Sequence, residues 1–272
     1  MLDPDDVTRA PQRRTGYTGT MKSFPPDSPL VHHVTPSPNH DQRALAADIL
    51  LLHYTGMKTT AVALERLCDP VARVSSHYVI DEGGRITQLV PEERRAWHAG
   101  ASSWEGETDI NSRSIGIEIG NVGHDLGYPD FPLAQIDAVI ALCRDIFRRH
   151  HIRADRVLAH SDIAPQRKID PGEKFPWQQL HRAGIGLWVA PQPPSAPGLG
   201  PGDRGAAVCA LQDALRRYGY GIEATGLYDE ATAVVVTAFQ RHFRQARVDG
   251  CADRSTVGTL QALLAARDGK LV

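Results

Sequence analysis

Two histidines that end apolar runs, and one aspartate in a nearby loop, are the residues of this sequence best suited to chemistry. His53 closes the apolar run 49–52, and His160 closes the apolar run 157–159. Asp170 follows in a polar loop that Pro171-Gly172 ends. Two imidazoles and one carboxylate are the ligand set of a catalytic zinc ion, with a fourth position open for water. If these three side chains converge, the sequence predicts a metal-dependent hydrolase.

The same pattern favours one zinc ion over other metal groups. Mixed nitrogen and oxygen ligands exclude an iron–sulfur cluster or a thiolate site. Zinc lowers the pKa of bound water toward ~7. Glu118 lies alone among apolar residues in the strand-like segment 114–120, where a buried carboxylate is costly without a partner or a task. We therefore expect Glu118 to act as general base, and Lys168, two residues before Asp170, to stabilise an oxyanion.

These residues belong to a segment in which strand-like and helix-like patterns alternate, from about residue 41 to 183. The predicted strands are 48–54, 75–81, 85–90, 114–120 and 156–160, and the predicted helices are 59–68, 132–150 and 175–183. Such alternation is typical of an α/β domain with a largely buried sheet. If the strands that end at His53 and His160 run parallel, both side chains project from the same edge of the sheet.

A second, helical unit is predicted after a linker rich in proline and glycine at 186–202. Within 203–272, the pattern Gly-x-x-Asp-x-x-Thr occurs at Gly226 and again 24 residues later at Gly250. Each copy predicts a glycine turn, an aspartate N-cap and a first helical turn. We expect a small three-helix domain that has no catalytic cluster of its own and serves in binding.

Composition excludes several classes of protein. The 272 residues are 42% hydrophobic and 23% charged, which is sufficient for a real core, and the net charge of −2 argues against a nucleic-acid partner. No apolar run approaches the ~18 residues that span a bilayer. The four cysteines show no C-x-x-C spacing; Cys68 and Cys143 are expected to be buried, and pairing of Cys209 with Cys251 is left open.

In five stretches the sequence resembles the zinc-dependent N-acetylmuramoyl-L-alanine amidases of the amidase-2 family, which share a fold with peptidoglycan recognition proteins. The resemblance covers about residues 45–183, and a weaker one, over about 200–266, is to three-helix peptidoglycan-binding domains. The matching stretches are Leu52-His53-Tyr54-Thr55-Gly56, Ser75-Ser76-His77-Tyr78-Val79-Ile80, Ala96-Trp97-His98-Ala99-Gly100, residues 110–118, and the loop from His160 to Gly172.

The resemblance implies a mixed sheet flanked by helices and a complete set of functional residues. The family's zinc ligands fall on His53, His160 and Asp170, and its catalytic glutamate and lysine fall on Glu118 and Lys168. Residues expected to line the substrate site are His77, Tyr78, Trp97, His98, Ala99 and Asn111. The implied reaction cleaves the amide bond between N-acetylmuramic acid, or its anhydro form, and L-Ala of the stem peptide.

Three matters stay open at this point. A non-catalytic recognition protein on the same fold is the alternative function, although such a binder would be expected to lack a ligand or Glu118. The substrate is either intact peptidoglycan or soluble anhydro-muropeptides, and the oligomeric state is unknown. The N-terminal stretch shows no signal peptide, which favours the cytoplasm, with the periplasm as the alternative. The predicted organisation is an N-terminal extension (1–40), a catalytic domain (41–185), the linker, and the helical domain.

Overall fold

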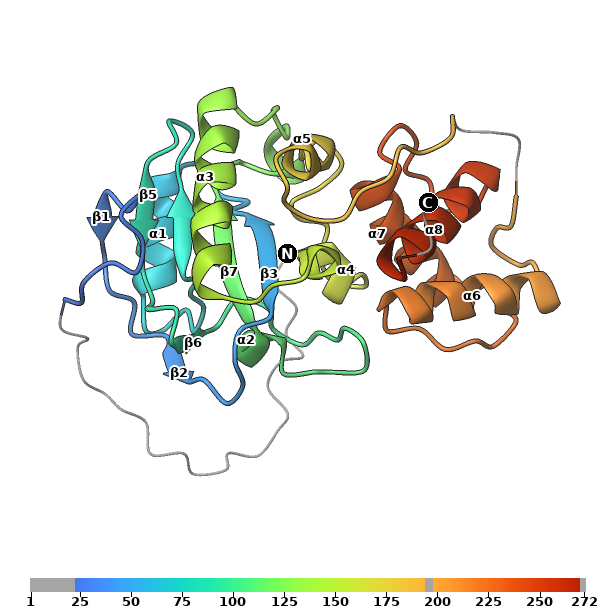
Figure 1. Ribbon diagram of the computed structural model, residues 1–272, viewed down its shortest axis with the longest axis horizontal. Coiled ribbons are helices and arrows are strands. Elements are labelled where there is room, and N and C mark those ends of the chain that lie inside the picture. The colour runs from blue at the N-terminus through green and yellow to red at the C-terminus, as the bar shows by residue number, and fades with distance from the viewer. Residues whose placement is uncertain (1–22, 194–197, 270–272) are drawn as a thin grey trace.

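A mixed six-stranded sheet forms the larger part of the molecule, and a helical unit packs beside it (Figure 1). The computed structural model describes residues 23–193 and 198–269. The strand order is β1-β5-β4-β7-β3-β8, with only β4 and β5 antiparallel, and β2 and β6 form a separate antiparallel pair. The strands are β1 (His33–Val34), β2 (His40–Gln42), β3 (Ile49–Tyr54), β4 (Tyr78–Ile80), β5 (Ile86–Gln88), β6 (Arg94–Ala96), β7 (Ser114–Ile119) and β8 (Val157–Ala159).

Helices cover both faces of the sheet (Figure 1). In β3, Leu50 and Leu52 pack with the core under α3, whereas Ile49 and Leu51 point to the opposite face, as a period of two requires. The fold class, an α/β domain with a mixed sheet followed by a helical unit, is therefore confirmed. The helices are α1 (Thr60–Cys68), α2 (Ile110–Arg113), α3 (Leu133–Arg149), α4 (His160–Ile163), α5 (Trp177–Arg182), α6 (Ala206–Tyr218), α7 (Glu230–Phe243) and α8 (Arg254–Arg267), with short 3-10 turns at His124–Leu126 and Ala154–Arg156.

The centre of the sheet sets the position of the predicted site. Strand β3 lies between β7 and β8 and runs parallel to both. His53 is directly opposite Glu118 on β7, and Leu52 is opposite Ala159, the residue before His160. Because the carboxyl ends of parallel strands share one edge, all three side chains belong to that edge.

The helical unit has the caps that its repeated motif predicts. Asp229 accepts a hydrogen bond from the backbone N–H of Thr232 at 2.9 Å and begins α7. Asp253 does the same for Thr256 at 2.7 Å and begins α8. All four cysteines are free thiols, so Cys209 and Cys251 are not joined.

Part of the predicted N-terminal extension belongs to the sheet domain. β1 pairs in parallel with β5, and β2, which begins at His40, pairs with β6. Neither pairing is predicted from the sequence, since strands of two and three residues are too short to show a period. Residues 1–22 of the predicted extension lie outside the described residues.

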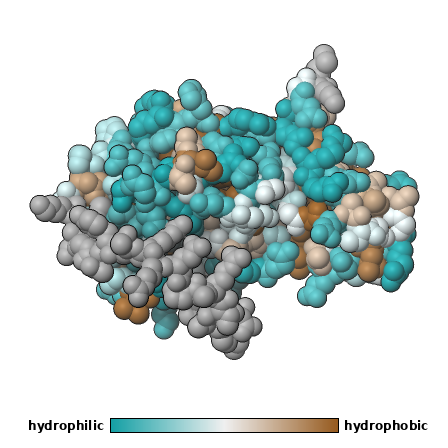
Figure 2. Space-filling model, turned by 90° about the horizontal axis from the view of Figure 1, so that it is seen from below, coloured by the Kyte–Doolittle hydropathy of each residue, from teal (hydrophilic) through white to brown (hydrophobic). Residues whose placement is uncertain are grey.

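The face seen from below is mostly hydrophilic, with small separate hydrophobic patches (Figure 2). Among the described residues, no helix is both long enough and apolar enough to cross a bilayer.

Candidate active site

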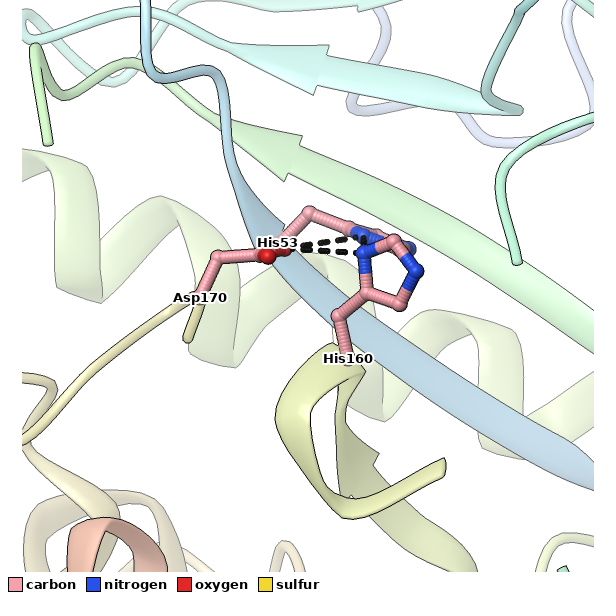
Figure 3. Close-up of side chains that lie close together, drawn as sticks. All are labelled: His53, His160 and Asp170. Carbon is pink, nitrogen blue, oxygen red and sulfur yellow. Dashed lines mark hydrogen bonds and ion pairs between the residues drawn. The ribbon is translucent and has the colours of Figure 1, made fainter. Parts of the chain in front are cut away.

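Three ligand atoms from distant parts of the chain meet at the carboxyl edge of the sheet (Figure 3). Nδ1 of His53, at the end of β3, lies 2.9 Å from Nδ1 of His160, the first residue of α4. Oδ2 of Asp170 lies 3.2 Å from the His53 atom and 3.1 Å from the His160 atom. All three residues are buried. The short distances between their ligand atoms show that the structure brings together the three residues predicted to bind a metal.

The donor set fits a divalent metal ion. Ligand atoms around a tetrahedral ion with bonds of 2.0–2.1 Å are separated by roughly 3.4 Å, close to the spacing of these three atoms. Burial, together with the nearby His160, lowers the pKa of His53 to about 4, so this ring is neutral at pH 7. Burial opposes ionisation of Asp170, but His160 and His53 nevertheless hold its pKa well below the usual range. A neutral imidazole and an ionised carboxylate are the forms that bind metals.

The outer ring nitrogen of His160 is held by the main chain. Nε2 of His160 lies 3.1 Å from the carbonyl oxygen of Ala99. A carbonyl only accepts, so Nε2 carries the proton and Nδ1 presents a lone pair to the site. The Ala99 carbonyl thus sets the tautomer that a metal ligand requires.

A chain of hydrogen bonds fixes the tautomer of His53. The hydroxyl of Ser114 donates to the carbonyl of Ile110 at 2.6 Å, so its oxygen is left to accept from Nε2 of His98 at 3.3 Å. Nδ1 of His98 is then unprotonated and accepts from Nε2 of His53 at 3.1 Å. Nδ1 of His53 is left with a lone pair that faces the site. The carbonyl of Ile110 therefore fixes the tautomer of His98 and, through His98, the tautomer of His53.

Two further residues hold His98 and Ala99 in place. Oδ1 of Asn111 accepts from the backbone N–H groups of His98 and Ala99, at 2.9 and 2.8 Å. Gly116 gives the His98 ring its space, because a Cβ at this position would lie 2.5 Å from Nδ1 of His98. These contacts make the segment around His98 a support for the metal-binding histidines.

Glu118 lies next to His53 and has an unusual environment. Among the described residues, its buried Oε2 has no hydrogen-bond partner. Burial and the charge of Asp170 raise the pKa of Glu118 to about 8, against the opposing effect of Lys168. An unpartnered carboxyl with a raised pKa, beside a candidate metal site, is typical of an acid–base group.

A cleft of about 660 Å³ opens over this edge of the sheet, within the range of small-molecule sites. Glu118, Lys168, Trp97 and His98 line it together with the three candidate ligands. Sequence reasoning missed the charged lining residues Arg66 and Asp125, whose surroundings in the sequence carry no motif. Arg167 also lines the cleft, and its position directly before Lys168 was a signal that could have identified it.

The other four residues predicted to line the substrate site are not among the residues that line this cleft. His77 is fully buried, where Nδ1 accepts from the backbone N–H of Gly116 at 3.0 Å. Tyr78 is also buried, and its hydroxyl donates to Glu92 at 2.6 Å. Ala99 and Asn111 have the supporting contacts described above. The structure thus gives these four residues internal partners rather than a place on the cleft wall.

Two family models match the chain. The model for N-acetylmuramoyl-L-alanine amidase matches residues 43–173, which include every candidate ligand, Glu118 and Lys168. The model for a putative peptidoglycan binding domain matches residues 204–260, which cover most of the helical unit.

Curated relatives and solved structures agree with this assignment. N-acetylmuramoyl-L-alanine amidase AmiD of Escherichia coli is 41% identical over 237 residues, spanning 79% of this chain and 82% of that protein. The 1,6-anhydro-N-acetylmuramyl-L-alanine amidase AmpD of Enterobacter cloacae is 40% identical over 109 residues, 40% of this chain and 56% of that protein.

Two structures are similar over almost their whole length. The complex of Escherichia coli AmiD with the substrate anhydro-N-acetylmuramic acid-L-Ala-D-gamma-Glu-L-Lys has a TM-score of 0.71 and 39% identity, covering 84% of this chain and 93% of that one. AmpDh3 from Pseudomonas aeruginosa has a TM-score of 0.67 and 32% identity, covering 91% of this chain and 99% of that one. With the amidase match over the cleft and these relatives, the chain belongs to the N-acetylmuramoyl-L-alanine amidase family.

Proposed function

We propose that this protein is a zinc-dependent amidase that cleaves the bond between N-acetylmuramic acid, or its anhydro form, and L-Ala of the stem peptide. The observation that carries the proposal is the convergence of His53, His160 and Asp170 in a cleft that Glu118 also lines. Two imidazoles and a carboxylate are a ligand set that suits one zinc ion with an open position. When bound, the ion would activate water and polarise the scissile carbonyl.

Glu118 would move the protons of the reaction. Its position opposite His53 places its carboxyl on the same face of the sheet as the candidate ligands. A nearby dication favours the ionised form and counteracts the effect of burial, so the carboxylate is available as a base. It would take a proton from the attacking water and deliver it to the nitrogen of the leaving L-Ala.

Lys168 would stabilise the negative charge that develops on the carbonyl oxygen. It lies in the same loop as Asp170 and lines the same cleft. Its influence on the pKa values of both Glu118 and His53 supports a position close to the reacting groups.

The cleft also suits a sugar–peptide substrate. Trp97 offers an aromatic surface, and Arg66 and Arg167 add positive charge to the lining. Cations of this kind attract the carboxylates of a stem peptide. The similar AmiD structure is a complex with an anhydro-muropeptide substrate, and AmpDh3 is also known in complex with an anhydromuramic pentapeptide.

A recognition protein without catalysis is the alternative. Such a protein needs the cleft but has no use for an unpartnered Glu118 beside a metal-binding triad. The presence of all five residues of the proposed machinery favours the enzyme.

The remaining predictions concern domains and location. We propose that 203–272 binds peptidoglycan, in line with the family match over 204–260. Action in the cytoplasm, with the periplasm as the alternative, stays a prediction that cell fractionation tests.

Mass spectrometry of reaction products tests the proposed function. The zinc-loaded protein is incubated with purified anhydro-muropeptides and, separately, with intact sacculi. The proposal predicts free stem peptides that begin with L-Ala, from one substrate or both, and none from the His160→Ala variant. If neither substrate is cleaved although zinc is bound, the recognition protein becomes the better explanation.

A further inference from the structure

Helix α4 connects two of the three candidate metal ligands. It begins at His160, and the backbone N–H of its second residue, Ser161, donates to the carbonyl oxygen of Asp170 at 3.0 Å. A shift of this four-residue helix therefore moves both His160 and the loop that carries Asp170. The contacts that hold α4 in place therefore also hold the candidate metal site.

The third residue of α4 is a buried acid whose hydrogen bonds come largely from the helical unit. Asp162 is 0% exposed, and its Oδ2 accepts from the backbone N–H of Ala159 at 2.8 Å. Oδ1 accepts from the hydroxyl of Tyr220 at 2.7 Å, and Oδ2 also accepts from Nδ1 of His242 at 2.7 Å. A buried carboxylate without donors is strongly destabilising, so this conformation of α4 depends on both residues.

The two donors are themselves fixed. The ring of His242 is stacked between Trp177 and Phe243, with centroid distances of 3.7 Å to each. Tyr220 is 1% exposed and packs against Trp104 with a centroid distance of 5.1 Å. Neither side chain is free to follow Asp162 if α4 moves.

The two units also share one hydrophobic core. Ile163 and Ala164, at the end of α4, belong to the same cluster as Phe239 and Phe243 of α7. Close to it, the backbone N–H of Glu105 donates to the carbonyl of Gly219 at 2.8 Å. A Cβ on Gly219 would lie 2.4 Å from the indole of Trp104. In Figure 1, α4 accordingly lies between the sheet and α7.

We propose that the helical unit is a structural part of the active site, and that Asp162, Tyr220 and His242 are positioning residues for α4. This role rests on the proposed function in one respect, because it takes His160 and Asp170 as metal ligands. It differs from the role of a tethered binding domain, which leaves the catalytic site unchanged when its own contacts change.

Two matched tyrosine variants of the full chain test the proposal. Tyr220→Phe removes the bond to Asp162, whereas Tyr228→Phe removes a bond of the same length, 2.7 Å, to the carbonyl of Gly250 inside the helical unit. Both tyrosines are 1% exposed. The first readout is amide hydrogen exchange of Ser161 and Ala164 in the metal-free protein. We expect exchange to be roughly tenfold faster in Tyr220→Phe and to change less than twofold in Tyr228→Phe.

The second readout is the zinc dissociation constant, measured by competition with a chelator. We expect Tyr220→Phe to raise it roughly 10-fold and to lower kcat with little change in KM, with Tyr228→Phe near wild type. His242→Phe keeps the ring stacking but removes the donor to Asp162, and it should raise the zinc dissociation constant more than Tyr220→Phe does. His242→Asn keeps a donor near the position of Nδ1 and should restore much of the affinity.

The outcomes separate the two proposals. If α4 exchanges at the wild-type rate in both Tyr220→Phe and His242→Phe, or if Tyr228→Phe perturbs α4 equally, the positioning role is overturned. If wild-type protein binds no zinc, the proposed function fails, whereas the exchange of α4 still decides whether the helical unit positions it.

Discussion

Two buried polar sites, one in each unit, are arranged in opposite ways. In the helical unit, Gln240 is fully buried, and its amide oxygen accepts from the N–H groups of Asp249 and Gly250, both at 2.9 Å. Its amide nitrogen donates to the carbonyl of Cys251 at 2.8 Å. At the sheet edge, by contrast, three acceptor atoms of His53, His160 and Asp170 face one another, and Oε2 of Glu118 has no partner among the described residues.

This contrast separates structural from chemical uses of buried polarity. A saturated group such as Gln240 contributes to stability because every donor and acceptor is used. A cluster of acceptors without donors is unfavourable until a cation or substrate supplies the missing charge. Variants in the two regions should therefore affect different properties of the protein.

The largest effect is expected from removal of one ligand. His160→Ala should lose most of the bound zinc and lower turnover by about 10⁴-fold or more, because two ligands hold the ion poorly. Elemental analysis and amide-cleavage assays measure both quantities. His33→Ala serves as control, because His33 is exposed, belongs to the edge strand β1 and is not among the residues that line the cleft. Full zinc occupancy in His160→Ala would refute the ligand assignment.

Glu118→Gln should separate catalysis from metal binding. The amide cannot take a proton, so we expect turnover to fall by roughly 10²–10⁴-fold while zinc content stays near wild type. Steady-state kinetics with a purified muropeptide gives the first value and elemental analysis the second. Unchanged turnover would remove Glu118 as the base.

The same substitution should alter the pH dependence of stability in the metal-free protein. Folding raises the pKa of Glu118 from 4.5 to about 8, so the stability linked to its proton is complete below pH 4.5 and is lost as the pH rises through 8. Glu118→Gln removes this loss. It should therefore stabilise the metal-free protein by up to a few kcal/mol above pH 8, at about 1.4 kcal/mol per pKa unit, and by little at pH 4.5.

Urea unfolding of both proteins at the two pH values, with a chelator present, measures the difference. An equal effect of the substitution at both values would show that Glu118 has an ordinary pKa.

A smaller effect is expected from the support around the histidines. Asn111→Ala removes the acceptor that holds the backbone of His98 and Ala99, so both ligand rings lose part of their orientation. We expect zinc affinity to fall by roughly 10- to 100-fold. Chelator competition measures it, and wild-type affinity in the variant would mean that the segment holds its position without Asn111.

The smallest effect on activity is expected from substitution of Gln240, whose side chain is fully hydrogen-bonded. Gln240→Leu should destabilise the protein by roughly 1–3 kcal/mol, because it leaves buried backbone groups without partners. Turnover of soluble muropeptides should stay within twofold of wild type while the variant is folded. Denaturant unfolding and kinetics test the two parts, and a large loss of turnover in the folded variant would erase the contrast between the regions.

Much of the fold follows from short-range patterns in the sequence. The continuous apolar run in β3 and the three- and four-residue spacing in α3 predict those elements, and the aspartate caps of α7 and α8 follow from one repeated motif. The convergence of His53 and His160 follows from the rule that parallel strands end at one edge.

Other features depend on contacts between distant residues. His98 was predicted to lie on the substrate wall, whereas its ring also orients His53, because Gly116 leaves space above β7. Asp162 and His242 are 80 residues apart and share no motif. The linker composition predicted separate units, yet apolar side chains from both sides form a single core, which no periodicity reveals.

X-ray absorption at the zinc edge, on protein loaded with one equivalent of zinc, tests the central claim most directly. We predict a first shell of nitrogen and oxygen that includes two imidazoles in the wild-type spectrum, and loss of this protein-bound spectrum in His160→Ala. A shell that contains sulfur from any of the four cysteines, or a spectrum unchanged by His160→Ala, would contradict the proposed ligand set.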